Sequence, residues 1–242
     1  MDHFQSIYAT YASAYHRMIA AEDAEGGLLP AILSIAPCDG GQNRAFRILD
    51  LGTGTGRFPL LLRDCPARVV GLDLQRAMLQ ENQEQRRLVQ GDWDLVQGDM
   101  RRLPIRDGWA DLVIAGWAIG HLRSWFEADW QAQVEAVLLE MQRALRPGGA
   151  LIILETLTTG SLSPSPPTPE LAEYYAWLEE KHGFSLQTIQ TDYQFSSVDE
   201  ALLRTGFFFD PELAALIRQN RWARVPEWTG LWSKLIPLPH VS

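Results

Sequence analysis

The chain has little cysteine. Its only two cysteines in 242 residues are Cys38 and Cys65, too few for a disulfide framework, and neither lies in a Cys-x-x-Cys or a Cys/His zinc pattern. We therefore expect no metal site and a reducing, cytoplasmic setting. The sequence also lacks a basic segment followed by an apolar one near Met1, and its longest apolar stretch, around 28–37, is short and broken by proline. We expect neither a signal peptide nor a membrane partner.

Basic residues are in the minority. The chain has 21 lysines and arginines against 30 aspartates and glutamates, a formal net charge of −9. Such a charge repels nucleic acid, so we expect no nucleic-acid partner. With 46% hydrophobic and 21% charged residues, the composition is typical of a folded globular protein. The length suits a single domain, 1–242, and leaves the oligomeric state open.

The most informative stretch is 47–58, RILDLGTGTGRF. An apolar run at 48–51 suits a buried strand, and a second run at 58–62 suits a helix. Glycines between a strand and a helix allow a tight turn and let a ligand approach the backbone. The dinucleotide fingerprint Gly-x-Gly-x-x-Gly would need a glycine where the chain has Arg57. The pattern favours a ligand without a pyrophosphate, and the alternative is an ordinary glycine-rich turn. The three glycines are Gly52, Gly54 and Gly56.

Strand and helix signals alternate from residue 47 onward. This alternation predicts an α/β fold with a doubly wound, mostly parallel sheet and helices on both faces. A proline-rich linker at 161–169 precedes a last section. The expected strands are 47–51, 68–72, 94–98, 111–116, 150–157, 184–195 and 227–236. The expected helices are 4–21, 24–35, 57–64, 75–86, 127–145, 170–182, 197–206 and 211–220.

Asp73 ends the second expected strand, 17 residues after Gly56. A carboxylate at this point can accept hydrogen bonds from both hydroxyls of a ribose that lies over the glycine loop. The alternative role is a helix cap, because the chain from Gln75 onward is predicted to be helical.

Asp99 ends the third expected strand, where a carboxylate can accept from an adenine amino group and Met100 can offer its backbone amide. The sequence LVQGD occurs twice, at 88–92 and at 95–99, so Asp92 is the alternative. We favour Asp99 because a turn and the fourth strand follow it directly.

Five segments in order, ILDLGTGTG, VVGLD, LVQGDMRRLP, DLVIAGWAIGHL and LRPGGALIILE, resemble the class I S-adenosylmethionine-dependent methyltransferases over roughly 47–157. The resemblance implies a Rossmann-like seven-stranded sheet whose last strand runs antiparallel to the rest. It implies a helical cap or lid at 1–40, a cofactor-binding core at 45–157 and a variable section at 158–242. The implied cofactor is S-adenosylmethionine, with S-adenosylhomocysteine as its product.

The resemblance also implies roles for residues. The glycine loop would lie at the methionyl part of the cofactor, Asp73 at its ribose and Asp99 at its adenine. Asp50 would support the loop. The predicted cofactor-binding residues are Tyr11, Tyr15, Asp50, Gly52, Thr53, Gly54, Gly56, Asp73, Leu74, Met78, Asp99, Met100, Gly116 and Trp117, of which the last two would border the sulfonium.

His121 is the predicted catalytic residue. It stands just past the fourth strand, at the carboxyl edge where ligands bind, and an imidazole can take a proton near neutral pH. The alternative is a histidine that packs or orients the loop. Glu155 is a second polar group expected in this cleft.

Tyr8, Tyr11 and Tyr15 stand three and four residues apart in the first expected helix, so they would share one face. They would form the underside of a lid over the cofactor, or else pack permanently onto the sheet.

We expect methyl transfer to a small-molecule acceptor, because the chain is acidic and shows no appended recognition domain. Two alternatives stay open. One is a protein that binds the cofactor or its product without catalysis, since cofactor residues alone do not make an enzyme. The other is an NAD-dependent oxidoreductase, which Arg57 disfavours.

Overall fold

The structure is a computed structural model that describes residues 3–38 and 45–238. Seven strands form one sheet in the order β3-β2-β1-β4-β5-β9-β6. β9 runs antiparallel to both of its neighbours, and the other pairs are parallel. This confirms the predicted doubly wound sheet with an antiparallel last strand. The strands are β1 (Phe46–Leu51), β2 (Ala67–Asp73), β3 (Trp93–Gln97), β4 (Ala110–Gly116), β5 (Leu145–Thr159), β6 (Ser185–Gln190) and β9 (Glu227–Leu235).

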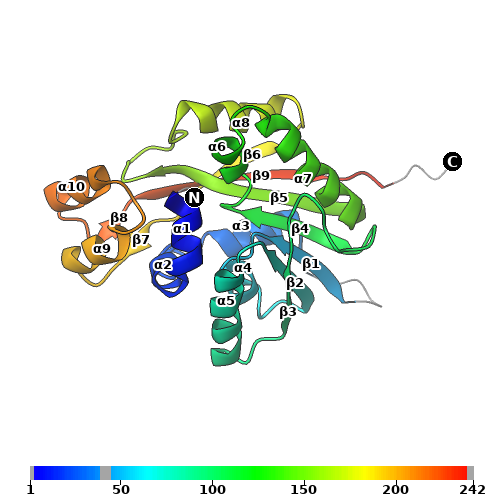
Figure 1. Cartoon of the computed structure of the whole chain (residues 1–242), viewed down its shortest axis with the longest axis horizontal. Coiled ribbons are helices and arrows are strands. Elements are labelled where there is room, and N and C mark those ends of the chain that lie inside the picture. Colours follow the sequence, from blue (N-terminus) through cyan, green and yellow to red (C-terminus); the bar gives the residue numbers. More distant parts are fainter. Residues whose placement is uncertain (1–2, 39–44, 239–242) are drawn as a thin grey trace.

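Helices cover both faces of the sheet (Figure 1). One face carries α3 (Leu28–Ile35), α4 (Arg57–Leu61) and α5 (Arg76–Leu88), and the other carries α6 (His121–Trp125), α7 (Trp130–Ala144) and α8 (Pro169–Glu180). Successive strand residues point to opposite faces. Leu49 and Val113 accordingly belong to the core under α7 and α8, and Ile48 and Leu112 to the core under α3 and α4. The continuous apolar runs of these strands follow from burial on both faces.

The N-terminal section differs from the prediction in two ways. The expected helix 4–21 is two helices, α1 (His3–Thr10) and α2 (Ala12–Ile19), separated at Tyr11. α3 packs in the core on one face of the sheet, so α1 and α2 alone are left for the predicted cap, and we call these two helices the cap. Residues 1–2 and 39–40 of the predicted cap 1–40 lie outside the described residues.

The expected strand 184–195 is also divided. Its first part is β6, and its end, β7 (Tyr193–Gln194), pairs instead with β8 (Arg224–Val225) in a separate two-stranded sheet. Between them lie α9 (Val198–Thr205) and α10 (Pro211–Asn220). Met18 and Ile19 of α2 share an apolar core with Tyr193, Phe195 and Ile217. We call this core, with its other buried members Ala201, Leu213 and Val225, the cap core.

Within the described ranges, no helix is both long enough and apolar enough to cross a membrane.

Candidate cofactor and acceptor site

The glycine loop joins β1 to α4 with its three glycines at positive φ, 67° at Gly52, 53° at Gly54 and 99° at Gly56. A Cβ on Gly52 would lie 2.4 Å from the Cβ of Ala118, and one on Gly56 would lie 2.8 Å from Asn82 Oδ1. These distances are too short for any side chain, and positive φ disfavours one in any case. The backbone of this loop therefore packs closely against Ala118 and Asn82, as a tight glycine turn requires.

Asn82 of α5 holds the loop from behind. Its Nδ2 donates to the carbonyl oxygen of Gly54 (3.1 Å), and its Oδ1 accepts from Trp93 Nε1 (2.8 Å). The side chain is fully buried. Sequence reasoning missed Asn82. The available signal was its position four residues after Met78, which places both on the sheet-facing side of one helix.

Asp73 links the glycine loop to the start of α5, and its predicted contact with a ribose stays a prediction. Its Oδ2 accepts from the backbone N–H of Gly54 (2.9 Å), and its Oδ1 accepts from the N–H of Gln75 (2.7 Å) at the start of α5. Burial raises the pKa of this carboxyl, and the backbone hydrogen bonds act against that rise. A carboxylate has about four acceptor sites, so lone pairs are left for ribose hydroxyls.

Asp50 lies in β1, two residues before Gly52, and is fully buried. Neither of its carboxylate oxygens has a hydrogen-bond partner in the described part of the chain. Burial raises its pKa to about 7, with the Thr53 hydroxyl acting against the rise and Asp73 adding to it. The influence of Thr53 places Asp50 beneath the glycine loop, where the sequence predicts that it supports the loop.

Asp92 and Asp99 lie at opposite ends of β3, because Asp92 precedes this strand and Asp99 follows it. Asp99 is thus at the carboxyl edge with the glycine loop. Its carboxylate is held by Arg101, with Nη2 2.6 Å from Oδ2 and Nε 3.0 Å from Oδ1, and this pairing lowers its pKa. An adenine amino group would therefore share the carboxylate with Arg101.

The end of β4 is built around Trp117. Its φ is 51°, and its N–H donates to the carbonyl oxygen of Leu154 (2.7 Å). The guanidinium of Arg57 lies 4.1 Å from the centre of the Trp117 ring, and Phe58 stacks on the same ring. A Cβ on Gly116 would come within 2.3 Å of the Phe58 ring, so only glycine fits there.

His121 begins α6 and faces the cap. Its Nε2 lies 2.9 Å from the hydroxyl oxygen of Tyr8, and its ring stacks on Trp125. Glu155 supports the segment before it, because its Oε1 accepts from the N–H of Gly120 (2.7 Å). Burial raises the pKa of Glu155 to about 8, and the nearby backbone amides act against the rise.

The cap tyrosines do not share one face, because the break at Tyr11 rotates the two helices. Tyr8 and Tyr15 contact each other with ring centres 5.4 Å apart, and Tyr15 is close enough to Asp73 and Arg57 for their charges to influence its pKa, which burial raises. Tyr11 is 53% exposed and lies against Phe207, away from the other two.

A further cap contact was missed by sequence reasoning. Nδ1 of His16 in α2 lies 2.9 Å from the hydroxyl of Thr55 in the glycine loop. Burial lowers the pKa of His16, which favours the neutral imidazole that can exchange a hydrogen bond with a hydroxyl.

The other predicted residues lie around the same loop. Thr53 is buried and donates its N–H to the carbonyl oxygen of Leu72 (3.0 Å). Met78 is buried on α5, and Leu74, beside Asp73, is half exposed. The Cε of Met100 would lie 3.7 Å from a Cβ on Gly52.

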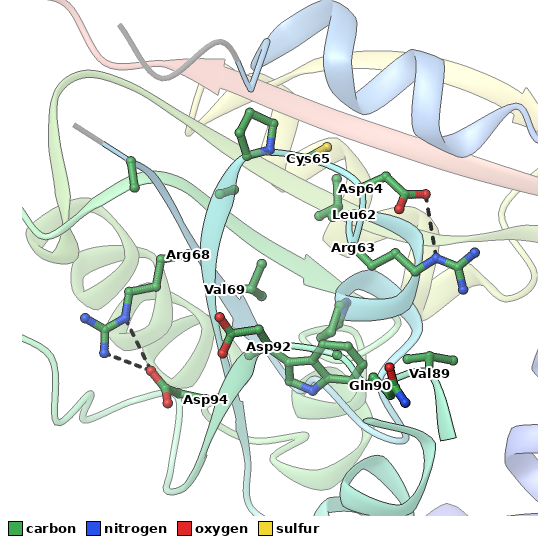
Figure 2. Close-up of a pocket in the computed structure, with 16 residues that line it drawn as sticks. Leu62, Arg63, Asp64, Cys65, Arg68, Val69, Val89, Gln90, Asp92 and Asp94 are labelled. Atoms are coloured by element: carbon green, nitrogen blue, oxygen red, sulfur yellow. Dashed lines mark hydrogen bonds and ion pairs between the residues drawn. The ribbon is translucent and has the colours of Figure 1, made fainter. Parts of the chain in front are cut away.

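A groove of about 1080 Å³ lies at the amino-terminal ends of β2 and β3, away from the glycine loop (Figure 2). Arg68 and Asp94, which form an ion pair with N and O 2.8 Å apart, line it together with Arg63 and Asp92. None of the predicted cofactor-binding residues lines this groove. Among residues 3–38 and 45–238, no group of three or more His, Cys, Asp or Glu side chains is arranged to hold a metal ion.

Comparison with known proteins gives the family. Residues 49–153 match the family described as a methyltransferase domain. The chain is 31% identical over 185 residues to the malonyl-[acyl-carrier protein] O-methyltransferase of Yersinia pestis, an alignment that covers 74% of this chain and 61% of that protein. The chain belongs to the class I S-adenosylmethionine-dependent methyltransferases. It spans about three fifths of the length of this curated relative.

Solved structures show the methyltransferase fold. Phosphoethanolamine N-methyltransferase 2 of Haemonchus contortus in complex with S-adenosyl-L-methionine has a TM-score of 0.60 at 17% identity, covering 98% of this chain and 60% of that one. The [4+2]-cyclase SpnF has a TM-score of 0.56 at 18% identity, covering 87% of this chain and 81% of that one. The methyltransferase fold therefore does not by itself define the reaction.

Proposed function

We propose that this methyltransferase chain transfers a methyl group from S-adenosylmethionine to a small-molecule acceptor. The observation that carries the proposal is the pair of hydrogen bonds from Gly54 and Gln75 to Asp73. They fix a carboxylate beside a loop in which Gly52 and Gly56 leave no room for a side chain. Such a carboxylate is suited to a ribose, and the loop to a ligand part that needs close backbone approach.

The residues present fit this cofactor. Gly52, Gly54 and Gly56 would hold its methionyl part, Asp73 its ribose and Asp99 its adenine, and Asp50 would support the loop. Bound there, the cofactor supplies a methyl group activated by a sulfonium. The protein would position the reactants, because Trp117 and the cap would exclude water and orient an acceptor. Orientation of this kind can lower an activation barrier by about 7–11 kcal/mol.

The acceptor would enter at the carboxyl ends of β4 and β5, between Trp117, His121 and the cap. An acceptor that arrives protonated needs a general base, and we propose His121 for this task, oriented by the Tyr8 hydroxyl. The name of the Yersinia pestis relative suggests a malonyl group on an acyl-carrier protein as a second, protein-linked candidate acceptor. The acidic chain disfavours a nucleic-acid acceptor.

A methyl-transfer assay tests the proposal. The protein is incubated with S-adenosylmethionine labelled in its methyl group and with acceptors bearing a carboxyl, a hydroxyl or an amine, including a malonyl thioester. We expect label to appear in one class of small molecule. If S-adenosylhomocysteine binds but no acceptor class is labelled, the chain is a cofactor-binding protein, or an enzyme of another reaction on the methyltransferase fold.

A further inference from the structure

Aromatic rings from three distant parts of the chain meet between the cap and α6. The ring centre of Phe4 in α1 lies 5.2 Å from that of His121 and 5.3 Å from that of Phe208, which follows α9. Tyr15 of α2 contacts both Phe208 and Tyr8, with ring centres 5.4 Å apart in each pair. We call these rings, together with Trp125 that stacks on His121, the ring cluster; its members are Phe4, Tyr8, Tyr15, His121, Trp125 and Phe208.

The ring cluster is not a sealed core. All six of its side chains are partly exposed, whereas Tyr193 and Phe195 of the neighbouring cap core are only 4% and 5% exposed. A contiguous apolar patch that stays in contact with solvent marks a place where a ligand or a partner binds. The ring cluster is therefore a candidate binding surface, and the cap core beside it is a structural one.

The ring cluster lies over the glycine loop. On the cap side, Nδ1 of His16, the residue after Tyr15, lies 2.9 Å from the hydroxyl oxygen of Thr55 in that loop. On the α6 side, a Cβ on Gly52 would lie 2.4 Å from the Cβ of Ala118, three residues before His121. Both walls of the cluster thus rise from the loop, at the place where the acceptor is proposed to enter.

Phe4 belongs to the part of the cap that can move most easily. α1 is separated from α2 by the break at Tyr11, and the turn after α2 is held to the glycine loop by Glu22, whose Oε2 accepts from Nη1 of Arg57 (2.7 Å). Phe4 stands seven residues before the break and Tyr8 only three. A tilt of α1 at Tyr11 therefore displaces Phe4 further than Tyr8.

The place that Phe4 takes is shaped for a flat ring. Its plane is inclined by 49° to that of His121 and by 58° to that of Phe208, and Trp125 fixes the plane of the imidazole by stacking on it at 9°. Aromatic rings attract each other in inclined and offset arrangements because their faces are negative and their edges positive. A saturated ring of the same size lacks this charge distribution and gains less from the same neighbours.

We propose that the methyl acceptor carries an aromatic ring, and that this ring takes the place of Phe4 between His121 and Phe208 when α1 tilts outward. This inference rests on the proposed function. It makes Phe208 a residue that determines specificity, and it makes Phe4 a competitor for the place of the acceptor ring. A reacting group attached to the ring then lies beside His121, on the side of the glycine loop.

Calorimetry with matched pairs of probes tests the inference. Protein saturated with S-adenosylhomocysteine is titrated with benzyl alcohol and cyclohexylmethanol, with benzylamine and cyclohexylmethylamine, and with phenylacetic and cyclohexylacetic acid. The members of a pair share their reacting group and their number of carbon atoms, and differ in the aromaticity of the ring. Because two rings flank the place, we expect the phenyl member of at least one pair to bind about tenfold more tightly.

Two variants should act in opposite directions on that pair. Phe208→Leu keeps an apolar side chain but removes one aromatic wall, so the preference for the phenyl member should fall to about threefold or less. Phe4→Ala removes the competing ring, so the phenyl member should bind about threefold more tightly than to the unmodified protein. A general loss of packing would instead weaken binding in both variants.

Trp109→Leu is the control. Trp109 is also a partly exposed ring, but it precedes β4 at the other end of the strand and lies under the guanidinium of Arg47. Its replacement should change neither the preference nor the affinity. A thermal melt identifies any variant that does not fold, and Phe4→Ala, near the start of the chain, serves if Phe208→Leu fails.

Three results would overturn the inference and leave the proposed function standing, provided that S-adenosylhomocysteine binds and another small molecule is methylated. They are a lack of preference for the phenyl member in every pair, a preference that both variants leave unchanged, and binding of neither member of any pair. Methyl transfer only to a malonyl group on a carrier protein would also overturn it. If S-adenosylhomocysteine does not bind, the proposed function fails, and the ring site fails with it.

Discussion

At the scale of single residues, the observed structural role of Asp73 can be separated from its predicted role in binding a ligand. It accepts from the N–H groups of Gly54 and Gln75 and is predicted to accept from a ribose. Hydrogen bonds to a charged group are worth about 1.5–3 kcal/mol each. We therefore expect Asp73→Ala to weaken S-adenosylhomocysteine binding about tenfold to several hundredfold, measured by calorimetry, and also to lower the melting temperature.

Asp94→Ala is the control, because Asp94 is exposed at the other edge of the sheet and pairs with Arg68. An unchanged ligand affinity in Asp73→Ala, together with a lowered melting temperature, would assign Asp73 to the loop and the helix start alone.

His121 and Tyr8 form the second residue-scale prediction. If His121 is the base, His121→Ala lowers turnover about a hundredfold or more and leaves cofactor affinity within about threefold. Tyr8→Phe removes the hydroxyl that lies 2.9 Å from Nε2 and should lower turnover less. The control is His182→Ala, at the end of α8 beside Glu135. Full turnover of His121→Ala with its true substrate would make His121 a packing residue.

Glu155 makes stability depend on pH in a defined direction. A glutamate in the unfolded chain has a pKa of about 4.3, whereas burial raises the pKa of Glu155 to about 8 in the folded protein. Between these values the folded state keeps a proton that the unfolded state has released, so rising pH favours unfolding. We expect Glu155→Gln to gain stability relative to the unmodified protein as the pH rises through this range. A difference in melting temperature that is independent of pH would contradict the assignment.

The sequence identified the glycines and Asp73 because the reason for them is local: a turn between adjacent elements needs glycine, and a strand end places a carboxylate next to it. Asn82, His16 and Glu22 were missed because their partners, Gly54, Thr55 and Arg57, lie 28, 39 and 35 positions away. The hydrophobic periodicity of a sequence does not show which distant side chain contacts a loop. The roles of the cofactor-binding residues stay predictions.

At the scale of elements, the cap and the section 193–225 form one structural unit. α2 contributes Met18 and Ile19 to the cap core, whose other members come from β7, α9, α10 and β8 and from Phe195, which follows β7. Figure 1 shows α1 and α2 beside α9 and the short strands at one end of the molecule. The division of 184–195 into β6 and β7 serves this unit, because β7 leaves the main sheet to pair with β8. The alternation of residues in the sequence predicted a strand at 184–195, but it did not predict that the end of this strand pairs with β8.

Hydrogen exchange measures this unit directly. We expect α2 and α9 to exchange at similar rates in the free protein and to slow together when S-adenosylhomocysteine is added, because closing segments complete a site and exclude water. α8, on the far side of the sheet, is the internal control. Deleting residues 1–21 should lower the melting temperature, since it exposes the cap core. Exchange in α2 that is unaffected by ligand would place the cap in permanent contact with the sheet.

At the scale of the whole molecule, the strand order explains where the site lies. β1 and β4 are adjacent in the sheet but not in the sequence, and the chain leaves them toward opposite sides of the sheet. Ligands of open α/β sheets bind at such a switch point, beyond the carboxyl ends of the strands. The glycine loop follows β1, and Trp117 and His121 follow β4. This arrangement was predictable because alternating strands and helices permit few topologies.

The central claim is that this switch point binds S-adenosylmethionine and not a dinucleotide. Titration calorimetry of the unmodified protein with S-adenosylhomocysteine and with NAD tests it most directly. The structure predicts saturable binding of S-adenosylhomocysteine with one site per chain and none of NAD, because Arg57 replaces the third glycine and is fixed by Glu22. Tight binding of NAD with none of S-adenosylhomocysteine would contradict the account.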